Sequence, residues 1–283
     1  MIVLASSDLT ATLRCLESLA KVPNAKCSKI VVKEEAISTD AIRSAYPDVP
    51  IFETKKAHFN KGIEWALIKP FQWICLLSNQ VVVDPNFLHE FMAEGRSSPE
   101  AKIFGAKILQ GERVLHLGGA WNQTTARYES IQHEETCQVS TPVETVSWDA
   151  LFMHRNVPET IGLLDPRFHK YWGDIDFCFR ARRKRFVVKT APKAKVWTQN
   201  SPADVTPQDH YFWWRGRLLW LERNLHPLER HKILKQIIHP ELRKAFWNSV
   251  TWALFFRSPK RRRRIPFVWE ELKAYLHYCL SKY

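Results

Sequence analysis

Hydrophobic positions in the first half of the chain follow two alternating patterns. Short apolar runs occur at residues 1–5, 30–32, 51–52 and 73–77, and they have the length of buried strands. Between these runs, apolar residues recur every three or four positions, as on one face of a helix. The alternation predicts an α/β domain whose mostly parallel, doubly wound sheet is flanked by helices.

The predicted helices have suitable ends. The first runs from Leu9 to Ala20, with Ser7 or Asp8 as its cap and Pro23 beyond its last turn. Further helices are predicted over residues 40–46, 62–68 and 174–184.

The middle of the chain is richer in strand patterns. Residues 103–117 predict a hairpin that turns at Gln110-Gly111, and strands are also predicted at 143–148 and 186–188. Gly118, Gly119 and the polar run 123–141 predict a long loop.

Near Ser201 the composition changes to a helical, basic pattern. We therefore expect a first domain over residues 1–200 and a helical basic extension over residues 201–283.

Composition supports a folded enzyme-sized domain. Of the 283 residues, 45% are hydrophobic, which is enough for a sizeable core. The six cysteines are scattered without a C-x-x-C pair, which argues against a zinc site or a disulfide framework and fits a reducing cytoplasm. Neither a secretory leader nor an apolar run of 18 residues is seen, so no membrane-spanning helix is expected.

The net charge of +13 is concentrated in the C-terminal part. Residues 201–283 hold 16 of the Lys and Arg residues against 7 Asp and Glu, together with 6 of the 12 tryptophans. This mixture indicates an anionic surface as partner, either lipid headgroups or nucleic acid. No nucleic-acid-binding motif occurs and the charge lies outside the α/β core, so we expect no nucleic-acid partner.

A membrane surface accounts best for this charge. The apolar stretch 246–256 is too short and too polar to span a bilayer, and it is followed by four arginines, 261–264. Such a segment can lie in the interface with its cationic flanks on anionic headgroups. The alternative is that its apolar residues pack on the rest of the protein and its arginines are solvated.

Ligands of doubly wound sheets bind at the carboxyl ends of the strands. This rule selects three groups of residues before any family is considered. They are Ala5, Ser6 and Ser7; Lys33, Glu34 and Glu35; and Ser78, Asn79 and Gln80.

Two carboxylates at a predicted helix start carry the candidate chemistry. Asp174 and Asp176 follow the aromatic pair Tyr171-Trp172. One interpretation is helix capping, because a helix N-terminus stabilises negative charge. The other is sugar chemistry, since a carboxylate beside an aromatic platform can bind a sugar ring and deprotonate a hydroxyl.

The segment GLLDPRFHKYWGDIDFCFR, residues 162–180, resembles the inverting family 2 glycosyltransferases of the GT-A fold, especially the rhamnosyltransferase-like branch. Weaker similarities occur in the order that the family shows. They are LRCLESL, LLSNQVVVDPNFL, ALFMHRNV, ARRKRFVVKTAPKAKVW and HYFWWRGRLLWL. Together they extend over most of residues 1–221.

The resemblance implies residue roles. Asp174 would be the catalytic base that deprotonates the acceptor hydroxyl, and Trp172 would stack on the acceptor or form a wall of the sugar pocket, with Tyr171 and Asp176 beside it. Asp176 and Arg180 would alternatively order the helix start. Asn60, in the sequence Asn60-Lys61-Gly62, matches the N-x-G of the donor loop.

Three positions depart from the family pattern. The metal-binding Asp of its N-x-D segment is replaced by Gln80, and its late metal-associated His by Thr198. The base-reading Asp after the second strand is also missing. A divalent cation, Mg²⁺ or Mn²⁺, therefore lacks its expected ligands, and no metal ligand is assigned.

Cationic side chains are the candidates to balance the diphosphate leaving group instead. They are Lys33, Arg155 and Arg215.

The sequence thus predicts an inverting glycosyltransferase that moves a hexose or deoxyhexose from a nucleotide-sugar to a glycan or lipid-linked acceptor. Such an enzyme can work without a metal ion. It would work in the cytoplasm, peripherally at the inner face of a membrane. The alternative is an inactive relative that binds glycan or serves as a scaffold.

Overall fold

A computed structural model of the chain describes residues 2–4, 8–23, 29–34, 38–54, 59–131, 139–168, 170–199, 205–254 and 263–280. The chain forms two compact units. Unit 1 consists of Met1–Ala120, Tyr128–Leu164 and Asp174–Asn200, and unit 2 of Trp121–Arg127, Asp165–Gly173 and Ser201–Tyr283. Two short segments of the predicted first domain thus group with residues 201–283.

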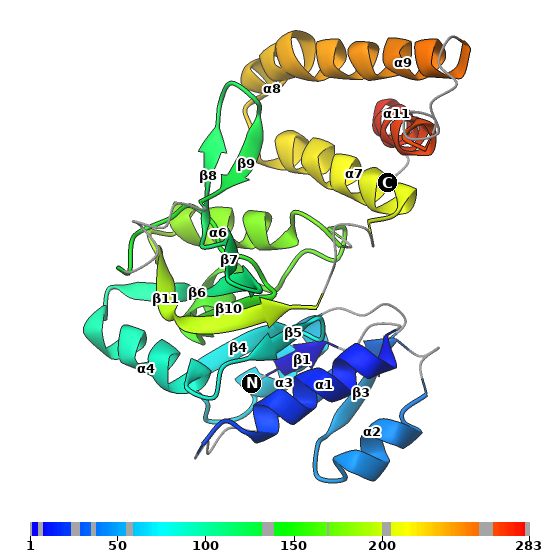
Figure 1. The fold of residues 1–283 in the computed structure, drawn as a ribbon. Helices are drawn as coiled ribbons and strands as arrows, with labels where there is room; N and C mark the ends of the chain where they lie inside the picture. The colour runs from blue at the N-terminus through cyan, green and yellow to red at the C-terminus, as the bar shows by residue number, and fades with distance from the viewer. Residues whose placement is uncertain are drawn as a thin grey trace. The chain divides into compact units, whose positions relative to one another are not determined.

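Unit 1 is built on a mixed, mostly parallel sheet (Figure 1). In the described part of the chain this sheet has nine strands. Eight follow the order β3-β2-β1-β4-β10-β6-β11-β5, and β7 pairs with β6. The strands are β1 (Ile2–Leu4), β2 (Ile30–Glu34), β3 (Ile51–Thr54), β4 (Trp73–Ser78), β5 (Val81–Val83), β6 (Ala101–Gln110), β7 (Arg113–His116), β10 (Ala150–His154) and β11 (Val187–Thr198). Strand β10 is antiparallel to both of its neighbours, and β5 is antiparallel to β11. The predicted fold class is confirmed.

Helices cover both faces of this sheet. They are α1 (Leu9–Ala20), α2 (Asp40–Ala45), α3 (Asn60–Leu67), α4 (Phe87–Ser97), α5 (Asn156–Ile161) and α6 (Gly173–Arg183). Alternate residues of β4 enter two separate buried clusters, because successive strand side chains point to opposite faces. Cys75 and Leu77 join the cluster under α1, α2 and α4, whereas Ile74 and Leu76 join the one under α3, α5 and α6.

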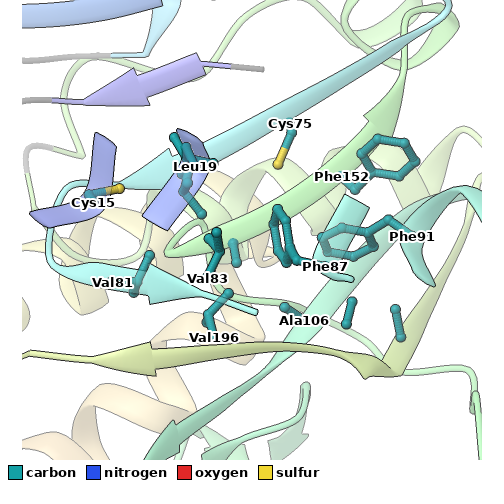
Figure 2. Packing of buried hydrophobic residues seen from close by; sticks show 14 of the residues in the cluster. Cys15, Leu19, Cys75, Val81, Val83, Phe87, Phe91, Ala106, Phe152 and Val196 are labelled. Atoms are coloured by element: carbon teal, nitrogen blue, oxygen red, sulfur yellow. The ribbon is translucent and has the colours of Figure 1, made fainter. Parts of the chain in front are cut away.

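Stacked aromatic rings hold β10 in the sheet interior. Phe152 of β10 lies against Phe91 of α4, with ring centroids 4.9 Å apart, and Phe91 in turn lies against Phe87 (Figure 2). On its other side Phe152 stacks on Trp73 of β4 at 4.7 Å. Offset ring stacking adds to the burial energy and favours one orientation. The start of β10 is therefore held in a fixed place beside the end of β4.

Two of the predicted segments have a different structure. The predicted loop contains the hairpin strands β8 (Gly119–Asn122) and β9 (Arg127–Ser130). Residues 143–148 contain one isolated bridge, from Thr145 to Gly119, rather than a strand. Their buried Val146 packs so closely over Gly105 of β6 that a Cβ there would lie 2.4 Å from the Val146 Cβ. This segment thus crosses a face of the sheet instead of pairing in its plane.

Unit 2 is helical, as expected. Its helices are α7 (Pro207–Asn224), α8 (Pro227–Ile233), the π-helical turn η3 (Leu234–Ile238), α9 (His239–Leu254) and α11 (Ile265–Cys279). Thr206 and Asp209 form a reciprocal capping box at the start of α7. Over the described residues, none of the helices has both the length and the apolar character needed to cross a bilayer.

Candidate active site

The polar ends of several strands meet at one edge of the unit 1 sheet. Leu4 of β1 is aligned with Ser78, the last residue of β4, and with Val32 of β2. Because β10 runs the other way, it begins at this edge, and the Ser78 amide donates to the Asp149 carbonyl over 3.1 Å. Asp149 therefore lies beside the end of β4.

Asp174 reaches the same edge from the first turn of α6. Its carboxylate accepts a hydrogen bond from the Ile175 amide at 2.9 Å and another from the Trp148 amide at 3.3 Å. Since Trp148 precedes Asp149, the two carboxyl groups are neighbours at this edge. The structure thus brings Asp174, Asp149 and Ser78 together.

The electrostatics of this carboxyl pair favour a proton acceptor that works near neutral pH. Burial raises the pKa of Asp174 to about 6; the Ile175 and Trp148 amides oppose the rise, and the charge of Asp149 adds to it. Burial also raises the pKa of Asp149, against hydrogen bonds from Ser147 and Ser78. Desolvation and a like charge both disfavour the ionised form, so Asp174 is a stronger base than an ordinary aspartate.

The two positions expected to bind metal also meet. Val81 pairs with Thr198 across β5 and β11, and the Gln199 amide donates to the Gln80 carbonyl over 2.7 Å. A side-chain amide and a hydroxyl are poor ligands for Mg²⁺ or Mn²⁺, which take carboxylates. Across the described ranges, no three His, Cys, Asp or Glu residues are grouped to hold a metal ion. The residues present do not fit the divalent cation.

Two of the predicted donor-binding side chains make hydrogen bonds within the protein at this edge. The Asn79 amide is buried and donates to the Thr12 hydroxyl at 2.9 Å and to the Asp8 carbonyl at 3.3 Å, which ties the start of α1 to the end of β4. The Asn60 amide exchanges two hydrogen bonds with the Leu164 backbone. Their described contacts are therefore structural, and their roles toward a donor stay predictions.

The predicted role of Arg155 is wrong. It follows the antiparallel β10, whose last residue pairs with Trp73 at the opposite end of β4 from Ser78. There its guanidinium donates to the carbonyls of Leu67 and Lys69. The direction of β10 therefore places it at the far edge of the sheet from Asp174.

Lys33 lies at the expected edge, but in a different environment from the one predicted. Its side chain is only 2% exposed, and its ammonium lies 3.3 Å from the Glu53 carboxylate on the paired strand β3. Glu53 already compensates its charge, so the structure does not support Lys33 as the cation for a diphosphate.

Other predicted donor residues are not placed at this edge. Ala5 and Ser6 lie outside the described residues, as does the side chain of Glu34. Arg215 belongs to unit 2, where it donates to the Arg167 carbonyl at 2.5 Å. Their assignments remain predictions.

The predicted acceptor residues have three different environments. Trp172 is buried in unit 2 against the rings of Trp213 and Trp220, so it is not the exposed platform that we expected. Asp176 is fully buried and pairs with Arg180 at 2.8 Å, which rules out an acceptor contact and fits the alternative role of ordering the helix start. Tyr171 is half-buried and lines a pocket of unit 2.

Asp149 is the residue that the sequence analysis missed. It directly precedes the apolar strand Ala150–His154, so its position next to a strand was visible. The rule used for selection considered only the ends of parallel strands. An antiparallel strand contributes its first residues to that edge, and its direction cannot be obtained from a hydrophobic pattern.

Comparisons with known proteins agree on the fold. No family model matches the chain, and no curated sequence matches it. The solved structure of GalNAc-T7 with UDP, GalNAc and Mn²⁺ is similar with a TM-score of 0.59 and 11% identity, over 98% of this chain and 56% of that chain. Mannosyltransferase PcManGT from Pyrobaculum calidifontis, in complex with GDP-Man and Mn²⁺, is similar with a TM-score of 0.58 and 11% identity, over 100% and 87%.

Two structures of S. aureus TarS extend this result. The 1–349 form has a TM-score of 0.51 and 13% identity, over 100% of this chain and 91% of that chain. A longer TarS chain gives 0.54 and 14%, over 99% and 52%. The chain spans about half the length of GalNAc-T7 and of this longer TarS. At these identities the likeness concerns architecture, and the chain has the GT-A fold of glycosyltransferases.

Proposed function

We propose that the protein is an inverting glycosyltransferase that moves a hexose or deoxyhexose from a nucleotide-sugar to a glycan or glycolipid. The observation that supports this best is the position of Asp174, at the ligand-binding edge of a GT-A sheet and with its pKa raised to about 6. The neighbours GalNAc-T7 and PcManGT were solved with UDP and GDP-Man respectively, which supports a nucleotide-sugar donor. The family 2 resemblance of residues 162–180 supports inversion.

In the proposed reaction Asp174 acts as general base. The acceptor hydroxyl oxygen attacks the anomeric carbon from the face opposite the nucleotide, and its proton passes to the Asp174 carboxylate. The bond from the anomeric carbon to the diphosphate oxygen breaks, and the nucleoside diphosphate leaves with the electron pair. Such base catalysis contributes roughly 10²- to 10⁴-fold to the rate.

The leaving diphosphate carries negative charge that the protein must balance. We assign no part of this to a metal, because Gln80 and Thr198 occupy the expected ligand positions. Arg155 lies at the far edge of the sheet and Lys33 is paired with Glu53, so neither of the two predicted cations in unit 1 is supported in this role.

The replacements at Gln80 and Thr198 also favour the second candidate function, a catalytically inactive relative that binds glycan or serves as a scaffold. The carboxyl pair distinguishes the two. A protein without activity gains nothing from a buried, partly charged Asp174, whose ionisation opposes folding. We therefore prefer the enzyme.

We further propose that unit 2 binds the anionic inner face of a membrane from the cytoplasm. Trp247 of α9 and Trp269 of α11 are 59% and 54% exposed, which is unusual for such large side chains. Arg263 and Arg264 are exposed just before α11. Tryptophan prefers the headgroup region, and each basic residue near an anionic surface adds about 1 kcal/mol.

The base assignment predicts that Asp174→Asn abolishes transfer. The amide cannot accept the proton, so we expect kcat to fall by at least about 10²-fold. Binding of the nucleoside diphosphate should change little, because Asp174 does not contact it in the proposed reaction. Transfer to a glycan acceptor and calorimetric titration with the nucleotide measure the two effects. In the wild type, kcat/KM should rise with pH around 6.

Asp48→Asn is the matched control, since Asp48 is exposed on a loop of unit 1. This variant should keep wild-type transfer. Full activity of Asp174→Asn would refute the base assignment.

The raised pKa also predicts a pH-dependent stability term. The folded-state pKa of Asp174, about 6, lies above the unfolded value of about 3.9, so protonation stabilises the fold. This stabilisation is complete below about pH 4 and is lost as the pH rises through 6, a loss of about 3 kcal/mol. Between pH 4 and pH 8 the wild type should therefore lose about 3 kcal/mol more unfolding free energy in urea than Asp174→Asn. Equal pH dependence of the two proteins would show that Asp174 titrates normally, and Asp48→Asn should behave as the wild type.

The ligand replacements predict that donor binding needs no divalent cation. Chelator should leave the dissociation constant of the nucleotide-sugar within about twofold, because the Gln80 amide and the Thr198 hydroxyl give a cation no charge. The double variant Gln80→Asp/Thr198→His restores the expected pair and should gain a Mn²⁺-dependent rise in Tm. Loss of donor binding in chelator-treated wild type would show that ligands lie elsewhere.

The membrane proposal predicts selective binding to anionic vesicles. The wild type should co-sediment with phosphatidylserine-containing vesicles and not with pure phosphatidylcholine vesicles, and salt should release it. Trp247→Ala/Trp269→Ala should weaken this binding by at least about tenfold, while Ile68→Ala, an exposed apolar change in unit 1, should not. Equal binding to both vesicle types would contradict the proposal.

A further inference from the structure

Unit 2 contains a pocket of about 340 Å³, and none of its residues takes part in the proton transfer proposed above. Its walls come from segments far apart in the sequence: the start of β9, the residues before α6, and helices α7, α9 and α11. The volume is at the lower end of the range of ligand pockets, roughly 300–1,000 Å³, and it suits one or two sugar rings.

Aromatic side chains form one part of the wall. Trp213 and Trp214 of α7 line the pocket together with Tyr171. Two guanidinium groups fix the indoles: Arg127 lies 5.0 Å from the Trp213 ring centroid, and Arg217 lies 4.8 Å from that of Trp214. Rigid aromatic surface is what binds the apolar C–H faces of a sugar ring, at little cost in side-chain entropy.

Three carboxylates form the polar part. Asp209 lies on α7, Glu241 on α9 and Glu271 on α11, and all three line the pocket. An ionised carboxylate accepts hydrogen bonds at about four lone-pair sites, so it can hold neighbouring hydroxyls after one partner is bound. Hydrogen bonds to charged acceptors are stronger than neutral ones.

Each carboxylate already has a basic side chain as its partner. Glu241 binds Arg127 and also Arg217, the latter at 2.9 Å. Glu271 lies 2.9 Å from the His210 ring. The pairs fix the orientation of the carboxylate oxygens, and the two arginines compensate the charge of Glu241.

Asp209 is held in the same way. Its carboxylate accepts from Lys170 at 2.5 Å and from the Thr206 amide at 2.8 Å in the capping box of α7. The polar groups of the pocket are thus oriented before any ligand arrives, which lowers the entropy cost of binding.

This charge pattern selects among ligand classes. The cations Arg127, Arg217 and Lys170 pair with these carboxylates and equal them in number, so the pocket has no surplus positive charge to bind a phosphate or another anion. Surplus negative charge beside an aromatic cage favours a quaternary ammonium, whereas the cations Arg127, Arg217 and Lys170 equal the three carboxylates in number. A neutral polyhydroxyl ligand uses both features, because its hydroxyls donate to fixed oxygens and its ring faces pack on indole.

We propose that this pocket of unit 2 binds a neutral saccharide unit, with Trp213 as its stacking platform and Glu241 and Glu271 as acceptors for its hydroxyls. Its assignment as a recognition site for the acceptor glycan rests on the proposed transferase function. Saccharide binding itself does not, since it involves no transfer and no nucleotide.

Titration of tryptophan fluorescence with a panel of neutral disaccharides (maltose, cellobiose, lactose and sucrose) tests this proposal on the full chain. We expect at least one of them to change the emission and to raise Tm. Trp213→Leu and Glu271→Gln should each raise its dissociation constant at least about tenfold. Choline chloride and inorganic pyrophosphate serve as probes of the competing ligand classes.

Two matched control variants test whether the loss of disaccharide binding is specific to the pocket residues. Glu270→Gln changes the neighbouring carboxylate on α11, which pairs with Lys273, and Leu228→Ala changes an exposed apolar side chain of α8. Both should bind the disaccharide as the wild type does. Glu271→Gln preserves side-chain shape, so it stays informative if Trp213→Leu unfolds.

The same titration on Asp174→Asn separates the two proposals. Saccharide binding that persists in this variant, with transfer lost, supports both. Binding without transfer in the wild type overturns only the transferase. Failure of every disaccharide to bind, binding that ignores the pocket variants, or binding of choline or pyrophosphate alone overturns the saccharide pocket.

Discussion

The antiparallel insertion of β10 between β4 and β6 is the constraint on which the candidate active site depends. It places the first residues of one strand at the edge where parallel strands end, and so sets Asp149 beside Ser78. The stacked ring of Phe152 fixes β10 in that place. The Trp148 amide then reaches Asp174, and two carboxyl groups share a partly buried site. Without this reversal, α6 would present a single, ordinary capping aspartate.

The hydrophobic pattern predicted the parallel half of the sheet well, because both of its faces are buried and its strands are continuous apolar runs. Helix α1, with Asp8 as one of its two candidate caps, was also predicted, because apolar spacing and a capping side chain are local features of the sequence. Prediction failed where tertiary packing decides. Val146 has the pattern of a strand residue, but it packs over Gly105 on a face of the sheet. The burial of Trp172 against Trp213 likewise depends on helix packing far along the chain.

The candidate site was predictable only in part, for a related reason. Asp174 was found because its neighbours in sequence carry a recognisable motif. Lys33 was placed at the correct edge, but its pairing with Glu53 depends on the register of β2 and β3. Arg155 lies at the edge of the sheet opposite to Asp174 because of the direction of β10. The direction of a strand cannot be predicted from its amino-acid pattern. The meeting of Gln80 with Thr198 shows, however, that two replacements found separately in the sequence concern one place in the structure.

The same residue type has opposite electrostatic surroundings in the two units. In unit 1, burial beside Asp149 raises the pKa of Asp174, which prepares it to take a proton. In unit 2, burial also acts to raise the pKa of Asp209, but hydrogen bonds from Lys170 and Thr206 outweigh it and lower the pKa. A carboxylate that stays ionised and fixed is a hydrogen-bond acceptor rather than a base. The contrast agrees with the two proposals, a proton acceptor at the sheet edge of unit 1 and fixed hydrogen-bond acceptors in the pocket of unit 2.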